Sequence, residues 1–418
     1  MNKNIIASPP FWGGREGLKS SVAIIGGGPA AMMLAAMLDE KKFDVTIYEK
    51  NITLGRKFLV AGEGGFNLTH SEEQKQFISR YTPPSFFERS ISSFTNTDLQ
   101  NWFNSIGIET FVGSSKRVFP INGIKPIEVL NAILNVLQKK DVSIKKQHTW
   151  KGWDNNKLFF ETTNLPVTVN VDISIFALGG ASWKITGSDG TWTNYFAEKG
   201  IEVIPFQASN CAYEIKWENE FIKIAEGKSL KNISLKCGIK EKKGEVVITK
   251  FGLEGGAIYA LSPEIRKQLN SISAAQLFID LKPSLTVAEI KNKISNRGNK
   301  SLSKQLENEL NLTQVQLALL KAVLSKEDFT SIDTLSQKIK NLPLLITSTA
   351  PIDESISTVG GISLNEIDNT FQLKKLPHHY IIGEMLDWDA PTGGYLLQGC
   401  FSMGYYLAKM LNEAKVPQ

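Results

Sequence analysis

The run Gly26-Gly27-Gly28-Pro29-Ala30-Ala31 constrains the fold of this chain more than any other feature. It follows Val22 to Ile25, a short apolar run typical of a buried parallel strand. Met32 to Leu38 then predicts a helix, and Asp44 to Tyr48 predicts a second strand that ends at Glu49. The order of strand, glycine turn, helix, strand and acidic residue is typical of a Rossmann-type dinucleotide-binding unit.

Each part of this pattern has a physical role in nucleotide binding. Gly26 permits a tight turn, Gly28 lets the backbone approach a pyrophosphate, and the helix that follows directs unpaired N–H groups at the phosphates. Glu49 lies about 20 residues further on, where a carboxylate accepts hydrogen bonds from ribose hydroxyls. The pattern does not separate FAD from NAD, although Glu49 disfavours a 2′-phosphate. The predicted contacts here are Gly26, Gly28, Pro29, Ala30, Glu49 and Lys50.

Two further glycine turns follow apolar strands. The segment "VDISIFALGGAS" ends a strand at Ala177-Leu178-Gly179-Gly180, and Tyr380 to Ile382 is followed at once by Gly383-Glu384. Downstream, Thr392-Gly393-Gly394 leads into a segment with helical potential that runs to Leu411. Three such turns, at the start, middle and end of the chain, suit one extended ligand such as FAD lying across a parallel sheet.

The motifs together resemble a bacterial FAD-binding flavoprotein family that includes aminoacetone oxidase and a proposed bile-acid reductase. The resemblance covers about Val22 to Leu411, and two positions depart from it: Gly65-Phe66 stands where Arg-Cys is usual, and His70 where Asn is usual. These departures indicate a divergent branch. The matching motifs are Gly55-Arg56-Lys57, Gly62 to His70 ("GEGGFNLTH"), Arg117 to Pro120 ("RVFP"), Gly360-Gly361-Ile362, Gly383 to Asp387 ("GEMLD") and Gly393-Gly394-Tyr395.

The resemblance extends the predicted site. The stretch Gly55 to His70 is expected to run along the pyrophosphate toward the flavin ring, with Arg56 or Lys57 offsetting phosphate charge. Glu384 is expected at the ribityl hydroxyls, and N–H groups after Gly394 at the N1–C2=O edge of the flavin. The further predicted cofactor contacts are Arg56, Lys57, Gly64, Asn67, Leu68, Thr69, Ala177, Gly179, Gly383, Glu384, Asp387, Gly394, Tyr395 and Leu396.

No residue is an unambiguous catalyst. Asn67, His70 and Arg117 are candidates: His70 as a proton carrier or a hydrogen-bonded loop histidine, and Arg117 as a carboxylate-binding residue or part of a structural ion pair. The four histidines form no cluster with metal-ligand spacing, so no metal site is expected.

The pattern changes in the middle of the chain. Short alternating stretches predict antiparallel strands, and from residue 286 to about 342 the apolar spacing becomes helical. We therefore expect an α/β protein with a Rossmann-like, glutathione-reductase-like FAD-binding domain over residues 1–200 and 358–418. A small inserted β domain is expected over residues 201–283 and 341–357, carrying a helical cap subdomain over residues 284–340.

Composition narrows the partners and the compartment. The formal charge of +5 over 418 residues is too small to indicate nucleic acid, and no apolar run is long enough to cross a membrane. The three cysteines are widely separated, which favours a reducing cytoplasm, and the first twenty residues contain no signal-peptide apolar core. The sequence does not indicate the oligomeric state.

The reaction we expect is an exchange of electrons between the flavin and a small molecule. No second glycine-rich nucleotide turn follows a later strand, and no cysteine pair is present, so a built-in nicotinamide domain is not expected. The prediction is an FAD-dependent oxidoreductase, aminoacetone oxidase-like or flavin reductase-like, that moves hydride to or from flavin N5. Amine oxidation and reduction of a conjugated double bond both stay open, with NAD(P)H or O₂ as diffusible partner. The alternative is a flavin-binding redox sensor or scaffold without turnover.

Overall fold

The computed structural model describes residues 19–60, 66–121, 123–295 and 301–414, and the chain divides into two compact units. The first unit combines residues 1–207 with 358–418, and the second comprises residues 208–357. The chain passes between the units in β11 (Val203–Ser209) and β19 (Ser357–Ile362), which pair with each other. The boundary falls at residue 208 rather than at the expected residue 201, because Phe206 of β11 packs edge to face on Trp192 of the first unit.

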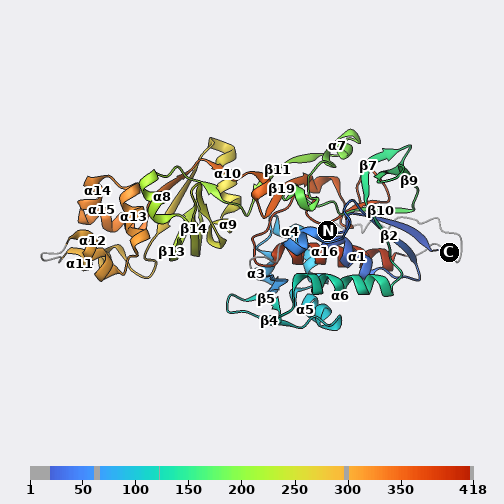
Figure 1. Cartoon of the computed structure of the whole chain (residues 1–418), viewed down its shortest axis with the longest axis horizontal. Coiled ribbons are helices and arrows are strands. Elements are labelled where there is room, and N and C mark those ends of the chain that lie inside the picture. The colour runs from blue at the N-terminus through green and yellow to red at the C-terminus, as the bar shows by residue number, and fades with distance from the viewer. Residues whose placement is uncertain (1–18, 61–65, 122, 296–300, 415–418) are drawn as a thin grey trace, which may run out of the picture. The chain divides into compact units, whose positions relative to one another are not determined.

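A five-stranded parallel sheet organises the first unit (Figure 1). In its register Ile24 lies opposite Ile175 on one side and Ile47 on the other, so the central strand is enclosed by apolar neighbours. This fits the continuous apolar runs from which the strands were predicted. Across the sheet, the strands are β20 (His379–Ile381), β10 (Ile173–Phe176), β1 (Ser20–Ile25), β2 (Phe43–Glu49) and β6 (Ser143–Lys146).

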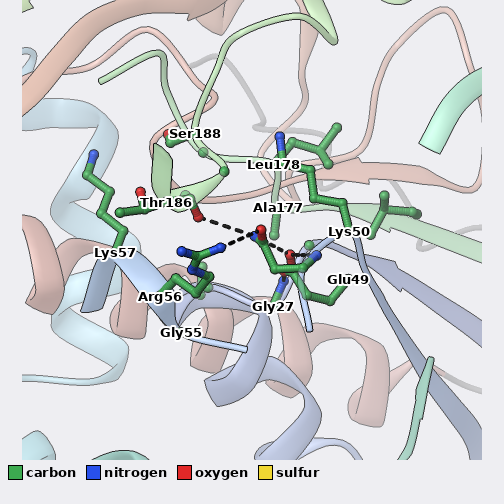
Figure 2. A pocket seen from close by; sticks show the side chains of 18 of the residues that line it. Gly27, Glu49, Lys50, Gly55, Arg56, Lys57, Ala177, Leu178, Thr186 and Ser188 are labelled. Carbon is green, nitrogen blue, oxygen red and sulfur yellow. Dashed lines mark hydrogen bonds between the residues drawn. The ribbon is translucent and has the colours of Figure 1, made fainter. Parts of the chain in front are cut away.

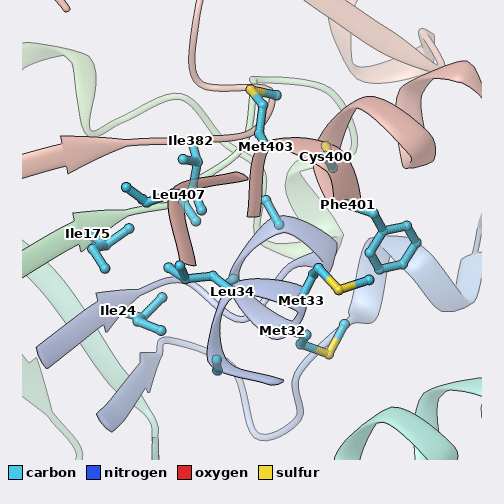
Figure 3. Close-up of a cluster of buried hydrophobic side chains, with 14 of the residues drawn as sticks. Ile24, Met32, Met33, Leu34, Ile175, Ile382, Cys400, Phe401, Met403 and Leu407 are labelled. Carbon is cyan, nitrogen blue, oxygen red and sulfur yellow. The ribbon is translucent and has the colours of Figure 1, made fainter. Parts of the chain in front are cut away.

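Helix α1 (Pro29–Met37) connects β1 to β2 and is buried on all sides from Ala30 to Ala36. It starts three residues earlier than the apolar pattern predicted, because a proline is well suited to the first helical position. The long C-terminal helix α16 (Tyr395–Glu413) packs against it (Figure 1). Methionines of α1 and apolar residues of α16 meet the strands in one core (Figure 3).

Smaller elements surround this core. On one side lie the antiparallel strands β7 (His148–Asp154), β8 (Lys157–Thr162) and β9 (Val167–Val169), with α7 (Thr193–Glu198) against β7. A second small sheet has the order β3 (Thr69–His70), β5 (Arg117–Pro120), β4 (Thr110–Val112). The accompanying helices are α2 (Arg56–Val60), α3 (Gln74–Ile78), α4 (Pro84–Ser93), α5 (Asn96–Ser105) and α6 (Pro126–Lys139).

The second unit contains a seven-stranded sheet and a helical segment that share one hydrophobic core. Across the sheet, the strands are β17 (Leu342–Ile346), β16 (Ala275–Asp280), β13 (Ser229–Cys237), β14 (Lys240–Ile248), β15 (Gly252–Glu254), β12 (Tyr213–Glu214) and β18 (Ser348–Thr349). Three helices lie among the strands in sequence: α8 (Asn219–Ala225), α9 (Gly256–Tyr259) and α10 (Ser262–Ile272). The helical segment comprises α11 (Val287–Ser295), α12 (Leu302–Leu310), α13 (Gln314–Val323), α14 (Lys326–Thr330) and α15 (Ile332–Lys340).

Candidate functional site

A cleft opens at the carboxyl ends of the parallel strands and encloses about 1000 Å³ of space that is open to solvent (Figure 2). It is lined by the turn after β1, the end of β2, Ala177 after β10 and Gly383 after β20. In open parallel sheets this edge is where ligands bind.

The glycine turn shapes one end of the cleft. Gly26 adopts a φ of +102°, and a Cβ there would lie 2.4 Å from the Ala177 carbonyl oxygen, so only glycine fits. Gly28 is different: its backbone is extended, and a Cβ would meet no atom within 4 Å. Because α1 begins at the next residue, the open space beside Gly28 faces the N-terminus of a helix, which favours a phosphate group.

Glu49 is fixed at the end of β2 although its side chain is almost wholly buried. Its Oε2 accepts a hydrogen bond from the Gly27 backbone N–H at 2.8 Å. Its Oε1 accepts two more, from the backbone and side-chain N–H groups of Asn51, each at 2.8 Å. Asn51 in turn accepts from Arg56 at 3.2 Å, so a small polar network lines the cleft (Figure 2). The carboxylate is therefore oriented before any ligand arrives.

Two lysines of the cleft are paired with carboxylates. Lys50 lies 2.7 Å from Asp189. Burial opposes ionisation of Asp189, but the hydrogen bond and charge of Lys50, together with hydrogen bonds from Thr191, outweigh it and lower the pKa. Lys57 lies 3.1 Å from Glu384 and donates to the Ser182 hydroxyl at 2.8 Å. The Lys57–Glu384 pair lies at the end of the cleft to which α16 contributes Cys400, whose thiol pKa is raised by burial.

Many predicted cofactor contacts converge on this cleft. The predicted residues that line it are Gly26, Gly28, Pro29, Ala30, Glu49, Lys50, Arg56, Lys57, Ala177, Gly179, Gly383 and Glu384.

The remaining predicted contacts do not line the cleft, and Gly64 lies outside the described residues. Leu68 and Thr69 are buried, and the Thr69 hydroxyl donates to Gln398 at 2.7 Å. Asp387 accepts a hydrogen bond from the Gly360 backbone at 2.9 Å. The other residues away from the cleft lining are Asn67, Gly394, Tyr395 and Leu396 among the predicted cofactor contacts, with His70 and Arg117 among the catalytic candidates.

Several of these residues form a second cluster where α16 begins. The rings of His70 and Tyr395 stack with centroids 5.2 Å apart. The Tyr395 hydroxyl donates to Glu72 at 2.5 Å, and Arg80 donates twice to the same carboxylate, at 3.0 and 2.9 Å. Burial opposes the ionisation of Glu72, but the hydrogen bonds from Arg80 and Tyr395 outweigh it and lower the pKa. We call these four residues the Glu72 cluster.

The environment of His70 in this cluster lowers the pKa of its imidazole. Its Nδ1 accepts the Glu72 backbone N–H at 3.2 Å, and the ring also makes a hydrogen bond to the Ser115 backbone. Burial is the main cause that lowers the pKa of His70, and the charges of Arg80 and Arg117 act in the same direction. His70 and Arg117 are paired directly across β3 and β5, so their side chains share a face.

The cleft also contains residues that the sequence patterns did not identify. Among the lining residues that were not predicted as contacts are Gly27, Asn51 and Cys400. For Asn51 the one signal in the sequence is its position two residues after Glu49, the acid that ends β2. The segment from Thr186 to Trp192 lines the cleft without a recognised motif. The same holds for His148, Thr149 and Trp150, which β7 brings to the cleft.

The described part of the chain contains no group of three metal-ligating side chains that could hold an ion, and no helix in it is long and apolar enough to cross a membrane.

The parallel sheet, the glycine turn and the acid that ends β2 define a dinucleotide-binding protein of the Rossmann class. A model of the HI0933-like protein Rossmann domain matches residues 20–410, and the chain belongs to this family. It is an FAD-dependent oxidoreductase. The expected α/β fold, family and FAD cofactor are thereby confirmed.

Curated relatives span the whole chain at low identity, as a divergent branch implies. The 3-dehydro-bile acid delta(4,6)-reductase of Clostridium scindens is 22% identical over 416 residues, covering 94% of this chain and 99% of the relative. The ribosomal RNA dihydrouridine synthase of Haemophilus influenzae is 25% identical over 407 residues, covering 93% and 98%. Among solved structures, the 3-ketosteroid delta1-dehydrogenase of Sterolibacterium denitrificans has a TM-score of 0.48 and 11% identity, covering 95% of this chain and 100% of that one.

The cleft fits FAD on its own geometry. The space beside Gly28 accepts a pyrophosphate at the start of α1, and the oriented Glu49 carboxylate stands where ribose hydroxyls donate. Glu384 and Cys400, which also line the cleft, are the residues that would lie along the remainder of a bound FAD.

Proposed function

We propose that this protein reduces a carbon–carbon double bond conjugated to a carbonyl group, on a small molecule, with a reduced nicotinamide as the diffusible electron donor. The net reaction adds a hydride to the β-carbon and a proton to the α-carbon, and the π bond between them is lost. The two electrons come from the nicotinamide, which leaves in its oxidised form. Bound FAD supplies the hydride chemistry, because its N5 both accepts and donates hydride.

The observation that carries this proposal is a chemical feature common to two relatives with different substrates. A 3-dehydro-bile acid with double bonds at positions 4 and 6 is a conjugated enone, and its reductase saturates it. Dihydrouridine is uridine whose C5=C6 bond, next to the C4 carbonyl, has been saturated. The activities for which both relatives are named therefore add hydrogen across a double bond activated by a carbonyl, which favours this reaction over amine oxidation.

The chain's own residues support the binding that this reaction needs. In the proposal, the N-terminus of α1 and the space at Gly28 hold the pyrophosphate, and Glu49 holds a ribose. The Lys57–Glu384 pair, which also reaches Ser182, orients the ribityl chain at the other end of the cleft. The three cysteines are all buried and form no disulfide, in keeping with a reducing compartment such as the cytoplasm, where reduced nicotinamides are formed.

A uridine in ribosomal RNA is the second candidate substrate, because the Haemophilus influenzae relative is named for it. Uridine presents the same activated double bond as a small enone. The formal charge of +5 over 418 residues is low for a protein that binds a phosphodiester backbone, and this favours the small molecule.

The test begins with purified FAD-loaded protein under anaerobic conditions. We expect NADH or NADPH to bleach the flavin absorbance, and a 3-oxo-Δ4 steroid or another conjugated enone to restore it while gaining two hydrogens in its mass spectrum. An unmodified ribosomal RNA transcript in a parallel reaction tests the second candidate. A Gly28→Glu variant without cofactor is the control for uncatalysed reduction.

Other results of this experiment would support a different function for the protein. Bleaching by amines but not by nicotinamides, with reoxidation by air, would replace the proposal with an amine oxidase. Flavin that no donor reduces, or that no acceptor reoxidises, would favour the redox sensor or scaffold without turnover.

A further inference from the structure

Arg117 is a half-buried cation to which the described residues supply no ion pair. It begins β5 and lies in partial contact with solvent, next to the fully buried Val118. Within the described residues, no hydrogen bond or ion pair involves its guanidinium group. A guanidinium presents several N–H donors in a fixed planar arrangement, so this group is suited to bind an anionic oxygen of a ligand.

The Glu72 cluster beside Arg117 does not supply an anion. The one carboxylate there, Glu72, already accepts two hydrogen bonds from Arg80 and one from Tyr395. His70, directly across the strand pair from Arg117, has a pKa lowered mainly by burial. Arg80 and Glu72 pair with each other, so among the described residues neither member of that pair is engaged with Arg117.

The position of Arg117 relates it to the cleft. A Cβ built on Gly393 would lie 3.4 Å from its Nε, and α16 begins two residues after Gly393. The same helix reaches the flavin end of the cleft at Cys400. Seven residues separate Gly393 from Cys400, roughly 10 Å along a helix. Arg117 thus lies outside the cleft lining, beside the segment that leads into the helix that contributes Cys400 to the cleft.

We propose that Arg117 binds a negatively charged oxygen of the substrate, and that this oxygen is the carbonyl oxygen of the reacting enone. The inference rests on the proposed function and adds a specific catalytic residue to it. When hydride adds to the β-carbon, the electron pair of the C=C bond moves toward the carbonyl and negative charge grows on its oxygen. Two parallel N–H donors of a guanidinium match such an oxygen and stabilise the enolate before the α-carbon takes a proton from water.

The neighbouring groups explain why the charge of Arg117 stays available. A protonated His70 would repel the guanidinium, and a free carboxylate would neutralise it. Burial lowers the pKa of His70, and the Glu72 carboxylate is already engaged by hydrogen bonds from Arg80 and Tyr395. The cluster acts on the substrate only through Arg117, so its members are positioning residues.

Binding to the FAD-loaded protein tests the proposal without turnover. The probes are 4-hydroxybenzaldehyde, whose phenolate resembles an enolate, benzoate as a carboxylate, and benzyl alcohol as a neutral analogue, each titrated by calorimetry. We expect Arg117→Met to weaken phenolate binding by about 10- to 100-fold, as loss of a charge-assisted hydrogen bond implies. Arg117→Lys should recover part of the affinity, and benzyl alcohol should bind equally weakly to all variants.

Arg89→Met is the matched control, because Arg89 is an exposed arginine on α4 and its loss removes the same charge elsewhere. It should bind phenolate as the wild type does. Equal phenolate affinity in Arg117→Met and wild type, or no binding of either anion to the wild type, would overturn the proposal. If Arg117→Met does not fold, wild-type phenolate affinity in Arg117→Gln, which also removes the charge, overturns the proposal instead.

Turnover measurements then distinguish whether Arg117 binds a carboxylate of the substrate or the carbonyl oxygen of the reacting enone. An enone without a carboxylate should lose kcat in Arg117→Met, whereas a KM effect confined to carboxylate-bearing enones would contradict the assignment to the carbonyl oxygen. Anion binding that depends on Arg117 in a protein that reduces no enone would leave the anion site standing and refute the proposed reaction alone.

Discussion

The Tyr395 hydroxyl donates to the Glu72 carboxylate over 2.5 Å, although 323 residues separate the two in sequence. The bond ties the first residue of α16 to the loop before α3, and Tyr81 adds a second tie by donating to the Tyr395 carbonyl at 2.7 Å. These two bonds hold the start of α16 against the segment from Glu72 to Tyr81. Gly393, just before α16, is also the residue that Arg117 approaches.

Replacing Glu72 by glutamine should destabilise the protein at neutral pH and much less in acid. Because the folded-state pKa of Glu72 is lowered, its stabilisation is present above the unfolded value of about 4.3 and is lost as pH falls through the folded value. We expect a cost of about 2 kcal/mol at pH 7 from the weakened charge-assisted hydrogen bonds. Thermal unfolding of wild type and Glu72→Gln from pH 7 to pH 3 measures it, with exposed Glu73→Gln as control. A difference in melting temperature that does not change with pH would contradict the charge argument.

His70 should remain neutral at physiological pH. Its folded-state pKa is lowered, so its imidazole signals in NMR should titrate below the ordinary value of about 6.5. The chain has four histidines, so a His70→Gln spectrum identifies the resonance by its disappearance. A His70 signal that titrates above 7 would mean that the ring is charged beside Arg117, and would remove the basis for a free guanidinium.

Gly28→Glu should lose FAD while keeping its fold. The new side chain enters open space, where its carboxylate repels the pyrophosphate. Gly26→Ala should behave differently, because its Cβ would collide with the Ala177 carbonyl in a backbone that favours glycine. We therefore expect loss of flavin absorbance in both variants, but a lowered melting temperature of the apoprotein only in Gly26→Ala. Wild-type flavin content in Gly28→Glu would show that the pyrophosphate lies elsewhere.

Gly394→Ala should test how closely α16 approaches β3. Gly394 has a φ of +97°, and a Cβ would lie 2.5 Å from the Thr69 backbone. Gly107 has a similar φ of +87° with nothing near its Cβ, so Gly107→Ala measures the backbone cost alone, about 1 kcal/mol. Chemical denaturation should show a clearly larger loss for Gly394→Ala. Equal losses would mean that Thr69 moves away without cost.

The nucleotide end of the cleft was predictable because its signals are local. Gly26, Gly28 and Glu49 lie within one strand–helix–strand unit, where spacing along the chain translates directly into position in space. The strand ends at Ala177 and Gly383 were predictable for the same reason, since parallel strands bring their carboxyl ends to one edge.

The other end was not predictable in the same way. Thr69 and Tyr395 were expected at the cofactor, but they bond to Gln398 and Glu72 instead of lining the cleft. Nothing in the sequence near Glu72 or Arg80 marks them as partners of a residue more than 300 positions away. Contacts of this kind depend on how helices and loops pack, and no periodicity in a single sequence records that.

The insertion of residues 208–357 has a consequence for how the protein is made. Strand β20 and helix α16, which complete the sheet, the core and the flavin end of the cleft, are encoded after the insertion. During synthesis, residues up to 207 therefore emerge before β20 and α16 exist, and the second unit is synthesised in between. We expect the cofactor to be retained only once β20 and α16 have been synthesised. A chain truncated before α16 should therefore be produced without bound flavin and without its yellow colour.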